Sequence, residues 1–206
     1  MGIGKLLIWG FALVFVAAGV AGGYMLLQGS PETPEFEGEG TEYHVANDWE
    51  DPGESDRFDY AEIEERAIEI TNEFRAEEDL EPLEFHEPSR EKARSHSADM
   101  ASNGYVGHVD SDGERPRDRM EDIDCTRIGE NAAVALYDVR EHDEWTDETE
   151  VNRDEEDVAR ALVHNWMASE SHRDNIMDDG FTSASVGVYV SEGHAVFGTQ
   201  KFCTEG

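Results

Sequence analysis

Two amphipathic helices are predicted where the folded part of the chain begins. Between Tyr60 and Phe74, apolar residues recur at three- and four-residue steps and acidic residues occupy the opposite face, which is typical of a surface helix. A second helix is expected from about Pro88, a residue suited to a first helical turn, to Gly104, a residue suited to a helix end. A short turn separates the two helices.

Later apolar positions add a long helix and a pair of strands. The pattern from residue 158 onwards predicts a helix that continues through "NWMASESHRDNIM", residues 165–177. Residues 184–190 and 194–202 have the period-two pattern of strands and are joined by a short glycine-containing turn, which predicts a strand pair. The stretch "IGENAAVALY", residues 128–137, is a strand or a helix by pattern alone.

The intervening segments are expected to be mostly irregular. A loop with a short helix near residues 117–122 follows the second helix, and the strongly acidic residues 138–157 are interpreted as a surface loop or an insertion. Helices precede the late strands, and no strand–helix–strand alternation occurs. The sequence therefore predicts an α+β fold with an antiparallel sheet.

The N-terminal residues 1–27 are predicted to be a membrane anchor or a signal sequence. From Leu6 to Leu27 the chain is apolar or small and uncharged, and about 20 such residues span a bilayer as a helix. Lys5 precedes this run and acidic residues follow it, which favours an inside N-terminus and an extracellular C-terminal domain. A cleaved signal peptide, and hence a secreted protein, is the alternative because "VAAGVAGG" offers small residues for cleavage. The length of the apolar run favours the uncleaved, single-pass anchor.

The rest of the chain divides into a linker and one domain. Residues 28–57 are rich in proline, glycine and acidic residues, a composition typical of a disordered, self-repelling linker. Residues 58–206 are long enough for one globular domain with a core of its own.

The charge of the chain excludes nucleic acid as a partner. The formal net charge is -33 at pH 7, and lysine occurs only as Lys5, Lys92 and Lys201, whereas phosphate binding requires clustered basic residues. Self-repulsion on this scale destabilises a compact chain in low salt, but at molar salt the Debye length is only about 3 Å. The composition is similar to that of proteins from extreme halophiles, and the charge is interpreted as solvated surface.

The chain contains two cysteines, Cys125 and Cys203. In an exported protein such a pair predicts one disulfide, and two free thiols are the less favoured alternative. A zinc-type cysteine cluster and the common hydrolase and nucleotide-binding motifs are absent from the sequence.

Four sequence blocks in order carry a family resemblance: "ITNEFRAEEDLEPLEF", "KARSHSADMASNGYVGH", "IGENAA" and "NWMASESHRDNIMDDGFTSASVGVYV". Together they resemble the CAP superfamily, the SCP-like extracellular domain of cysteine-rich secretory proteins, antigen-five allergens and plant pathogenesis-related proteins, and most of all its prokaryotic branch. The resemblance covers about residues 59–202. It implies an α-β-α sandwich around a central antiparallel sheet.

The resemblance also implies a cleft with two histidines and two acidic residues. The histidines match His108 and His172, and the first acid matches Glu130. The second acid belongs three residues after the helix tryptophan, where this chain has Ser169. Glu170 is adjacent but would be turned about 100° around a helix. The set is therefore incomplete, which argues against full metal coordination and against acid–base catalysis.

The chemistry of these residues points to a metal or to a hydrogen-bonded cleft. His108 and His172 are metal ligands of the type that binds Zn²⁺ or another divalent ion, and Glu130 is suited to be a ligand, a partner of a ligating histidine or a general base. Their positions on separate segments give no support from spacing. Taken without the family, the residues favour a hydrogen-bonded polar cleft.

Other polar and aromatic residues receive structural interpretations. Ser169 and Ser171 beside His172 suggest a serine hydrolase, but the nucleophile turn and the oxyanion loop of such an enzyme are absent from the sequence. Packing or hydrogen-bonding roles are expected for the following residues: Trp166 as a core or cleft-wall aromatic, Asn131 and Asn175 as backbone ties, Asn72 and Arg75 as buried contacts of the first helix, and His96 as a satisfied structural histidine.

The sequence thus favours an extracellular, membrane-tethered binding or interaction module with a His/Glu-lined cleft that takes up a divalent metal. The alternative is a metal-assisted or His/Glu-dependent hydrolase acting on cell-surface peptide or polymer. An extracellular ligand, a protein or a lipid are the partners considered, and the family sometimes implies lipid binding. The sequence shows no additional apolar patch in favour of lipid.

Overall fold

The computed structural model describes residues 57–191 and 193–206 of the chain. The predicted anchor, residues 1–27, and all but the last residue of the predicted linker, residues 28–57, lie outside the described residues. Within the described ranges, no helix is long and apolar enough to cross a membrane.

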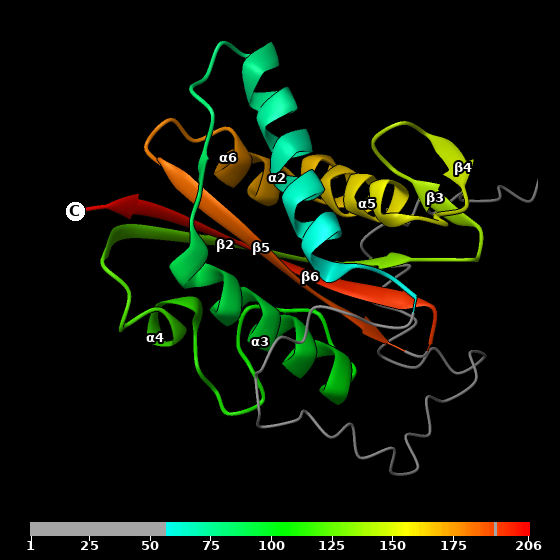
Figure 1. Cartoon of the computed structure of the whole chain (residues 1–206), viewed down its shortest axis with the longest axis horizontal. Helices are drawn as coiled ribbons and strands as arrows, with labels where there is room; N and C mark the ends of the chain where they lie inside the picture. Colours follow the sequence, from blue (N-terminus) through cyan, green and yellow to red (C-terminus); the bar gives the residue numbers. More distant parts are fainter. Residues whose placement is uncertain (1–56, 192) are drawn as a thin grey trace, which may run out of the picture.

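The described chain forms helices on both sides of one main sheet (Figure 1). The elements in chain order are α2 (Tyr60–Glu77), β1 (Glu84–Phe85), α3 (Glu87–Asn103), α4 (Pro116–Arg119), β2 (Cys125–Leu136), β3 (Glu141–Asp143), β4 (Glu148–Glu150), α5 (Glu155–Ala168), α6 (Glu170–Ile176), β5 (Ser183–Ser191) and β6 (Ala195–Glu205). In the view of Figure 1, α3 and α4 lie below the sheet, and α2, α5 and α6 lie above it. This arrangement is the α-β-α sandwich that the family resemblance implies.

The main sheet has the strand order β1-β5-β6-β2, so β2 is an edge strand. The β2–β6 and β5–β6 pairs are antiparallel, which confirms the late strand pair and makes "IGENAAVALY" part of a strand. The prediction of a purely antiparallel sheet is wrong, because β1 pairs with β5 in parallel. With only two exposed residues, β1 is too short to leave a pattern in the sequence.

Helices approach the sheet closely where glycine removes the side chain. A Cβ atom at Gly187 of β5 would lie 2.7 Å from the Ala93 Cβ of α3. On the opposite face, a Cβ atom at Gly198 of β6 would lie 2.8 Å from a methyl carbon of Leu162 in α5. The helices α2 and α5 pack with the sheet in the larger apolar core, and α3 closes a smaller one around Met100.

Local residues bound the first two helices, and Gly104 is the helix end that the sequence predicts. Asp59 caps α2 by accepting hydrogen bonds from the backbone N–H groups of Ala61 and Glu62, as side chains at this position commonly do. Gly104 ends α3 in the left-handed conformation, with φ of 66°, where glycine carries no steric penalty.

Three predictions of local structure are corrected. The helix expected through residues 165–177 is two helices, because Ser169 has extended backbone angles and ends α5 before α6 begins. The acidic residues 138–157 are not a plain loop, since they contain the hairpin β3–β4 and the first turn of α5. The short helix expected near residues 117–122 is one residue earlier and shorter, and a proline begins it.

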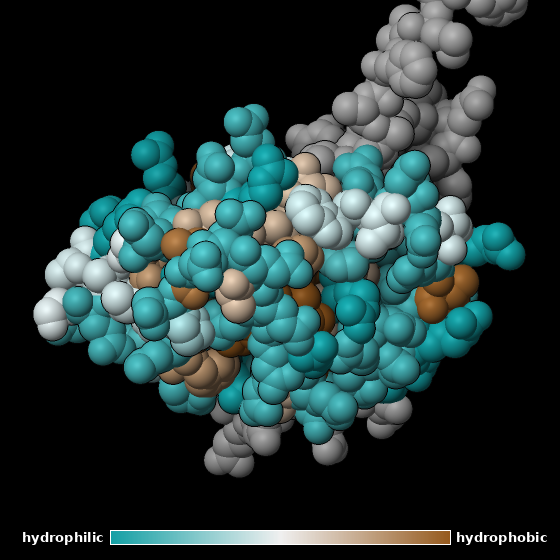
Figure 2. All heavy atoms as spheres, turned by 90° about the horizontal axis from the view of Figure 1, so that it is seen from above, coloured by the Kyte–Doolittle hydropathy of each residue, from teal (hydrophilic) through white to brown (hydrophobic). Residues whose placement is uncertain are grey.

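The surface has the character that the composition predicts. Figure 2 shows a face on which hydrophilic side chains dominate and hydrophobic ones occur in small, separate groups. Among the described residues, the large hydrophobic side chains with substantial exposure are Phe85, Val109 and Trp145. Trp145 packs edge-on against Phe74, with ring centroids 5.5 Å apart.

Candidate functional site

The candidate site lies along the edge strand β2. Neighbouring residues of a strand point to opposite faces, so the side chains of Glu130 and Asn131 lie on opposite faces of β2. The Glu130 carboxylate lies on the α3 side, 3.7 Å from Nε2 of His96 and beside Lys201, its partner across the β2–β6 ladder. The Asn131 amide lies on the α6 side, where its Nδ2 donates to the carbonyl oxygen of His172 at 3.1 Å. Segments from opposite faces of the sheet therefore meet at its edge.

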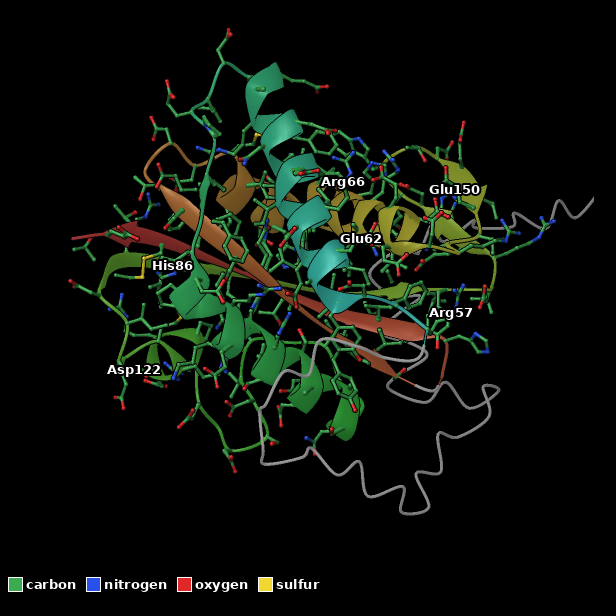
Figure 3. The ribbon with its side chains drawn as sticks, in the orientation of Figure 1. Arg57, Glu62, Arg66, His86, Asp122 and Glu150 are labelled. Carbon is green, nitrogen blue, oxygen red and sulfur yellow. A yellow bond between two sulfur atoms is a disulfide. The ribbon has the colours of Figure 1, made fainter. Side chains whose placement is uncertain are left out.

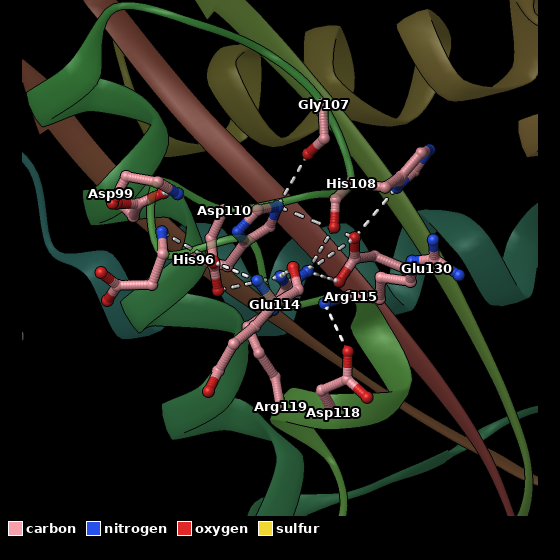
Figure 4. A network of polar contacts seen from close by, with 12 residues as sticks. His96, Asp99, Gly107, His108, Asp110, Glu114, Arg115, Asp118, Arg119 and Glu130 are labelled. Atoms are coloured by element: carbon pink, nitrogen blue, oxygen red, sulfur yellow. Dashed lines mark hydrogen bonds and ion pairs between the residues drawn. The ribbon is translucent and has the colours of Figure 1, made fainter.

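Glu130 is the centre of a buried polar cluster (Figure 4). Its carboxylate accepts hydrogen bonds from Arg119 Nη2 at 2.8 Å, from His108 Nδ1 at 2.9 Å and from Lys201 Nζ. An ionised carboxylate only accepts hydrogen bonds, so Nδ1 of His108 carries a proton and donates it to Glu130. Glu130, Arg119 and Lys201 are 7%, 9% and 1% exposed, and their ion pairs are therefore largely shielded from water.

The cluster keeps Glu130 ionised. Burial on its own raises the pKa of the Glu130 carboxyl, but the hydrogen bond from His108 and the positive charge of Lys201 lower it, with smaller contributions from His96 and Arg119, to about 2. The opposite effect holds at Lys201, where burial lowers the pKa and the carboxylate of Glu130 counteracts it. Near pH 7, Glu130 is a fixed negative charge that is already paired.

Arg119 connects this charge to the loop that carries His108. Its Nη2 donates to the His108 carbonyl oxygen at 3.0 Å, and its Nη1 donates to Asp110 Oδ2 at 3.2 Å and to the Glu114 carbonyl oxygen at 2.8 Å. The guanidinium group therefore fixes both the backbone of the loop and Glu130. His108 is held at its backbone and at Nδ1, while its side chain remains 46% exposed.

His172 faces His108 from the short helix α6. The two ring centroids are 6.0 Å apart, and the ring planes are inclined by 74°. Burial lowers the pKa of His172 to about 4, with a smaller contribution from the charge of His108, so its ring is neutral at pH 7. Asn175 donates to the Glu130 carbonyl oxygen at 3.3 Å and to Asn131 Oδ1 at 2.9 Å. The predicted role of both asparagines as backbone ties is confirmed.

The position expected to hold a second acid contributes no carboxylate. Ser169 lies at the break between α5 and α6, and its Oγ is 3.3 Å from Oγ of Ser171. Because of this break, the expectation that Glu170 is turned 100° around a continuous helix does not apply. Glu170 is exposed in the first turn of α6. Among the contacts of the described residues, no hydrogen bond or ion pair joins Ser169, Ser171 or Glu170 to His172.

A surface cavity of about 300 Å³ adjoins the Glu130 cluster. Its lining residues are Lys92, Ser95, His96, Asp99, Asp110, Asp112, Glu114 and Arg119. It shares His96 and Arg119 with the cluster, but its lining includes neither His108 nor His172. The two facing histidines are therefore not part of this cavity.

The described residues bring no compact set of three ligand side chains together at His108 and His172. Within the described ranges, one group of histidine, cysteine and acidic side chains has its ligand atoms all within 4.8 Å of one another, and it does not include His108 or His172. Glu130 is occupied by its ion pairs. The exposed ring of His108 and the neutral ring of His172 are thus the available donors at this site.

The predicted disulfide is present and links Cys125 to Cys203, with Cα atoms 5.4 Å apart. The predicted core position of Trp166 is confirmed, since this residue is fully buried. Asn72, predicted to be a buried contact, is half-buried, and it exchanges hydrogen bonds of 2.8 and 3.0 Å with the backbone of Leu83. Arg75 is 1% exposed and donates to backbone carbonyl oxygens, as expected for a buried contact of the first helix.

Three members of the cluster, His96, Arg119 and Lys201, are not predicted to belong to it by the sequence. The sequence predicts a satisfied structural histidine at His96, and this is only partly correct. Its Nε2 is 2.7 Å from the Gly107 carbonyl oxygen and 3.7 Å from Glu130, but its buried Nδ1 has no hydrogen-bond partner among the described residues. Arg119 and Lys201 were not singled out. Lys201 carried a signal, because a lysine inside an apolar strand pattern is unusual in a chain that uses lysine three times.

Comparison with known proteins places residues 68–202 within the sequence model of the cysteine-rich secretory protein family, CAP. The uncharacterized membrane protein YlbC of Bacillus subtilis is 30% identical over 127 residues, which are 61% of this chain and 31% of that protein. The uncharacterized protein YkwD of the same bacterium is 32% identical over 141 residues, 68% of this chain and 46% of that protein. The chain therefore spans less than half the length of these two relatives.

Two solved structures share the fold. An extracellular protein containing an SCP domain from Bacillus anthracis superposes with a TM-score of 0.55 at 24% identity, over 71% of this chain and 41% of that chain. An outer surface protein from Borrelia burgdorferi superposes with a TM-score of 0.53 at 13% identity, over 68% of this chain and 90% of that chain. At these identities the likeness establishes the fold alone.

Proposed function

The chain belongs to the cysteine-rich secretory protein (CAP) family, and we propose that its domain is an extracellular, membrane-tethered binding module that takes up a divalent metal at His108 and His172. The observation that carries this proposal is the arrangement of the two imidazole rings, which come from separate segments and lie edge to face with their centroids 6.0 Å apart. With two protein ligands, such an ion keeps open positions for an external ligand.

The geometry of the rings supports a shared ion. Two imidazoles bound to one tetrahedral Zn²⁺ through bonds of about 2.0–2.1 Å have ring centroids roughly 5 Å apart. The observed separation of 6.0 Å is about 1 Å larger, a difference that small side-chain rotations remove. His172 is neutral near pH 7, and a neutral imidazole is the form that ligates a metal.

Glu130 has the role of a partner to the ligand His108. A metal-ligating histidine usually donates its other ring N–H to a carboxylate or carbonyl, which fixes the tautomer and the orientation of the ring. The hydrogen bond from His108 Nδ1 to Glu130 at 2.9 Å is of this type, and it directs Nε2 away from the cluster. Arg119 and Lys201 in turn hold the carboxylate in place.

The same contacts weigh against the hydrolase alternative. A general base works best when its pKa lies near the operating pH, but the pKa of Glu130 is about 2 and its oxygens are occupied. Ser169 and Ser171 form no hydrogen bond to His172 within the described chain, so they lack the activation that a serine nucleophile needs.

The proposed location rests on the sequence and on the names of relatives. The apolar residues 6–27 suit a membrane anchor. The relative YlbC is described as a membrane protein, and the Bacillus anthracis structure is described as an extracellular protein. The disulfide between Cys125 and Cys203 suits an oxidising compartment.

Calorimetric titration with ZnCl₂ in molar KCl tests the metal site, with the disulfide left intact. We expect one binding event for the wild type, and its loss in His108→Ala and in His172→Ala. The matched control is His142→Ala, which removes a histidine of β3 whose side chain is 53% exposed. Absence of heat in the wild type, or equal heats in all four proteins, would overturn the proposal.

A peptidase assay in the same salt tests the alternative. The binding-module proposal predicts no turnover of an unfolded protein substrate by the wild type. Turnover that disappears in Glu130→Gln and in His172→Ala, but persists in His142→Ala, would establish the hydrolase instead.

A further inference from the structure

A second set of metal-ligand side chains converges at the end of the β2–β6 ladder where Cys125 begins β2. Cys125 begins β2, and its partner across the ladder is Glu205. Cys203 lies two residues before Glu205 on β6, and alternate residues of a strand point to the same face. Residues opposite each other in an antiparallel pair also share a face. Both cysteines and Glu205 therefore lie on one face of the two strands.

His86 reaches this face from the chain that enters α3. One ring nitrogen of His86 and the sulfur atoms of Cys125 and Cys203 all lie within 4.8 Å of one another. Figure 3 shows the labelled His86 next to the yellow bond of the disulfide. His86 is 5% exposed and Cys203 is fully buried, whereas Cys125 is half-buried and the Glu205 side chain is 68% exposed, so the group is open to water on the Glu205 side.

The hydrogen bonds of His86 leave one nitrogen available to a ligand. Nδ1 is 2.8 Å from the Ser89 hydroxyl, which also contacts the Ser185 hydroxyl at 2.7 Å. Because that hydroxyl can accept from Nδ1–H while donating its own proton, the tautomer with the lone pair on Nε2 is satisfied. Nε2 is directed toward Glu205, whose Oε1 is 3.7 Å away.

We infer that, when the disulfide is reduced, the two thiolates, His86 Nε2 and the Glu205 carboxylate hold one Zn²⁺ ion. Two sulfurs, one imidazole nitrogen and one carboxylate oxygen form a tetrahedral donor set of the kind that zinc takes in proteins. The Nδ1–H bond to Ser89 is the outer hydrogen bond that metal-ligating histidines usually make. The site is separate from His108 and His172 and does not rest on the function proposed for them.

The chemistry balances with a dithiol as the reductant. The donor passes two electrons and two protons to the Cys125–Cys203 bond, which yields two thiols, and the donor itself becomes a disulfide. Binding of Zn²⁺ then releases both thiol protons, since the thiolate is the ligand form of cysteine. The ion would join the start of β2 to the end of β6, the same two segments that the disulfide joins.

The experiment uses the full chain carrying His108→Ala and His172→Ala, so that the other histidine pair contributes no zinc. One sample stays oxidised, and the other is reduced with a dithiol and freed of it by gel filtration without oxygen. Zinc content is measured after dialysis against ZnCl₂. We expect one zinc per reduced chain and none per oxidised chain.

Cobalt substitution and a His86 variant identify the ligands. Co²⁺ in the reduced protein should give the intense near-ultraviolet thiolate absorption of a tetrahedral site. Adding His86→Ala should weaken zinc binding more than about tenfold. Loss of a residue that only hydrogen-bonds to a metal ligand already weakens binding by at least about that factor, and His86 is proposed as a direct ligand. His194→Ala is the matched control. His194 lies in the turn between β5 and β6, away from the cysteines, and its Nδ1 is 3.2 Å from the Tyr137 carbonyl oxygen.

Each outcome decides the inference. Equal zinc in the oxidised and reduced samples overturns it, as does zinc binding by the reduced chain that His86→Ala leaves unchanged. If reduction unfolds the domain, circular dichroism is followed during zinc addition. Refolding at one equivalent of zinc supports the site, and a chain that stays unfolded in excess zinc refutes it.

Discussion

Replacing Glu130 by glutamine removes the negative charge that Arg119 and Lys201 share in the buried cluster. The substitution keeps the size of the side chain and can still hydrogen-bond, so that its effect is mainly electrostatic. Two cations that are 9% and 1% exposed would then lack their common partner. Breaking a buried ion pair by removing one member costs roughly 3–5 kcal/mol of folding stability.

The pKa of Glu130 gives the pH dependence of this loss. The pKa of the Glu130 carboxyl falls from its ordinary value of 4.5 to about 2 in the folded chain. This shift corresponds to about 3 kcal/mol of folding stability at pH 7. Because the folded pKa is the lower one, the stabilisation is complete above the unfolded pKa and is lost as the pH falls through the folded pKa. It declines to about 1.4 kcal/mol at pH 3 and to less than about 0.5 kcal/mol at pH 2.

Urea unfolding at pH 7 and at pH 3 measures this effect, in molar KCl with a chelator to remove metal. Urea is uncharged and leaves the ionic strength constant, and equal slopes for both proteins show that the unfolded states are comparable. We expect the free energy of unfolding of Glu130→Gln to lie at least about 3 kcal/mol below that of the wild type at pH 7. At pH 3 the difference should be about 2 kcal/mol smaller.

A second variant separates the charge from the packing. In Glu130→Gln/Lys201→Met the buried ammonium is gone as well, so the double variant should recover part of the stability that the single variant loses. A wild-type advantage that is the same at pH 3 as at pH 7 would refute the assignment of Glu130 as an ionised, paired carboxylate. So would a single variant as stable as the wild type at pH 7.

Three further predictions concern the scaffold. Gly187→Ala should lower the free energy of unfolding by about 1–3 kcal/mol, because the new Cβ meets the backbone of α3. Gly107→Ala should lower it less, since its Cβ would meet ring carbons of Tyr105 only at 3.6 Å. Urea unfolding of both variants measures the difference. Cys125→Ala/Cys203→Ala should lose up to about 4 kcal/mol, since the disulfide closes a loop with a sequence separation of 78, and a midpoint equal to that of the wild type would contradict this. With a net charge of -33, the thermal midpoint should rise as KCl increases from millimolar to molar, and a midpoint independent of salt would contradict the screening argument.

The repeating pattern of apolar residues predicted the helices that bury one face over several turns and the strands that bury alternate residues. It located α2, α3 and the β5–β6 pair, since a periodic face must meet the core wherever the rest of the chain lies. Asp59 and Gly104 act at the helix ends through hydrogen bonds to their own neighbours, and such local signals do not depend on the fold.

Elements that depend on distant partners were missed. The break at Ser169 lies inside a continuous apolar pattern, and β1 becomes a strand only because β5 lies beside it. The hairpin β3–β4 is acidic, but Asp143 on it pairs with His164 of α5, which is 8% exposed. Charge along the sequence indicated a solvated loop there, whereas the contact with α5 decides the structure.

The sequence by itself determined the class of fold and the disulfide pair, and through the family resemblance it predicted three residues of the candidate site: His108, Glu130 and His172. Only the tertiary structure decided what those residues can do. The pairing of β2 with β6 places Lys201 opposite Glu130, 71 residues away in sequence, and α4 adds Arg119. A glutamate is written with the same letter in a sequence whether its carboxylate acts as a free base or as a buried counter-ion. Its charge partners and its pKa depend on burial and on strand register, and both exist only after the chain has folded.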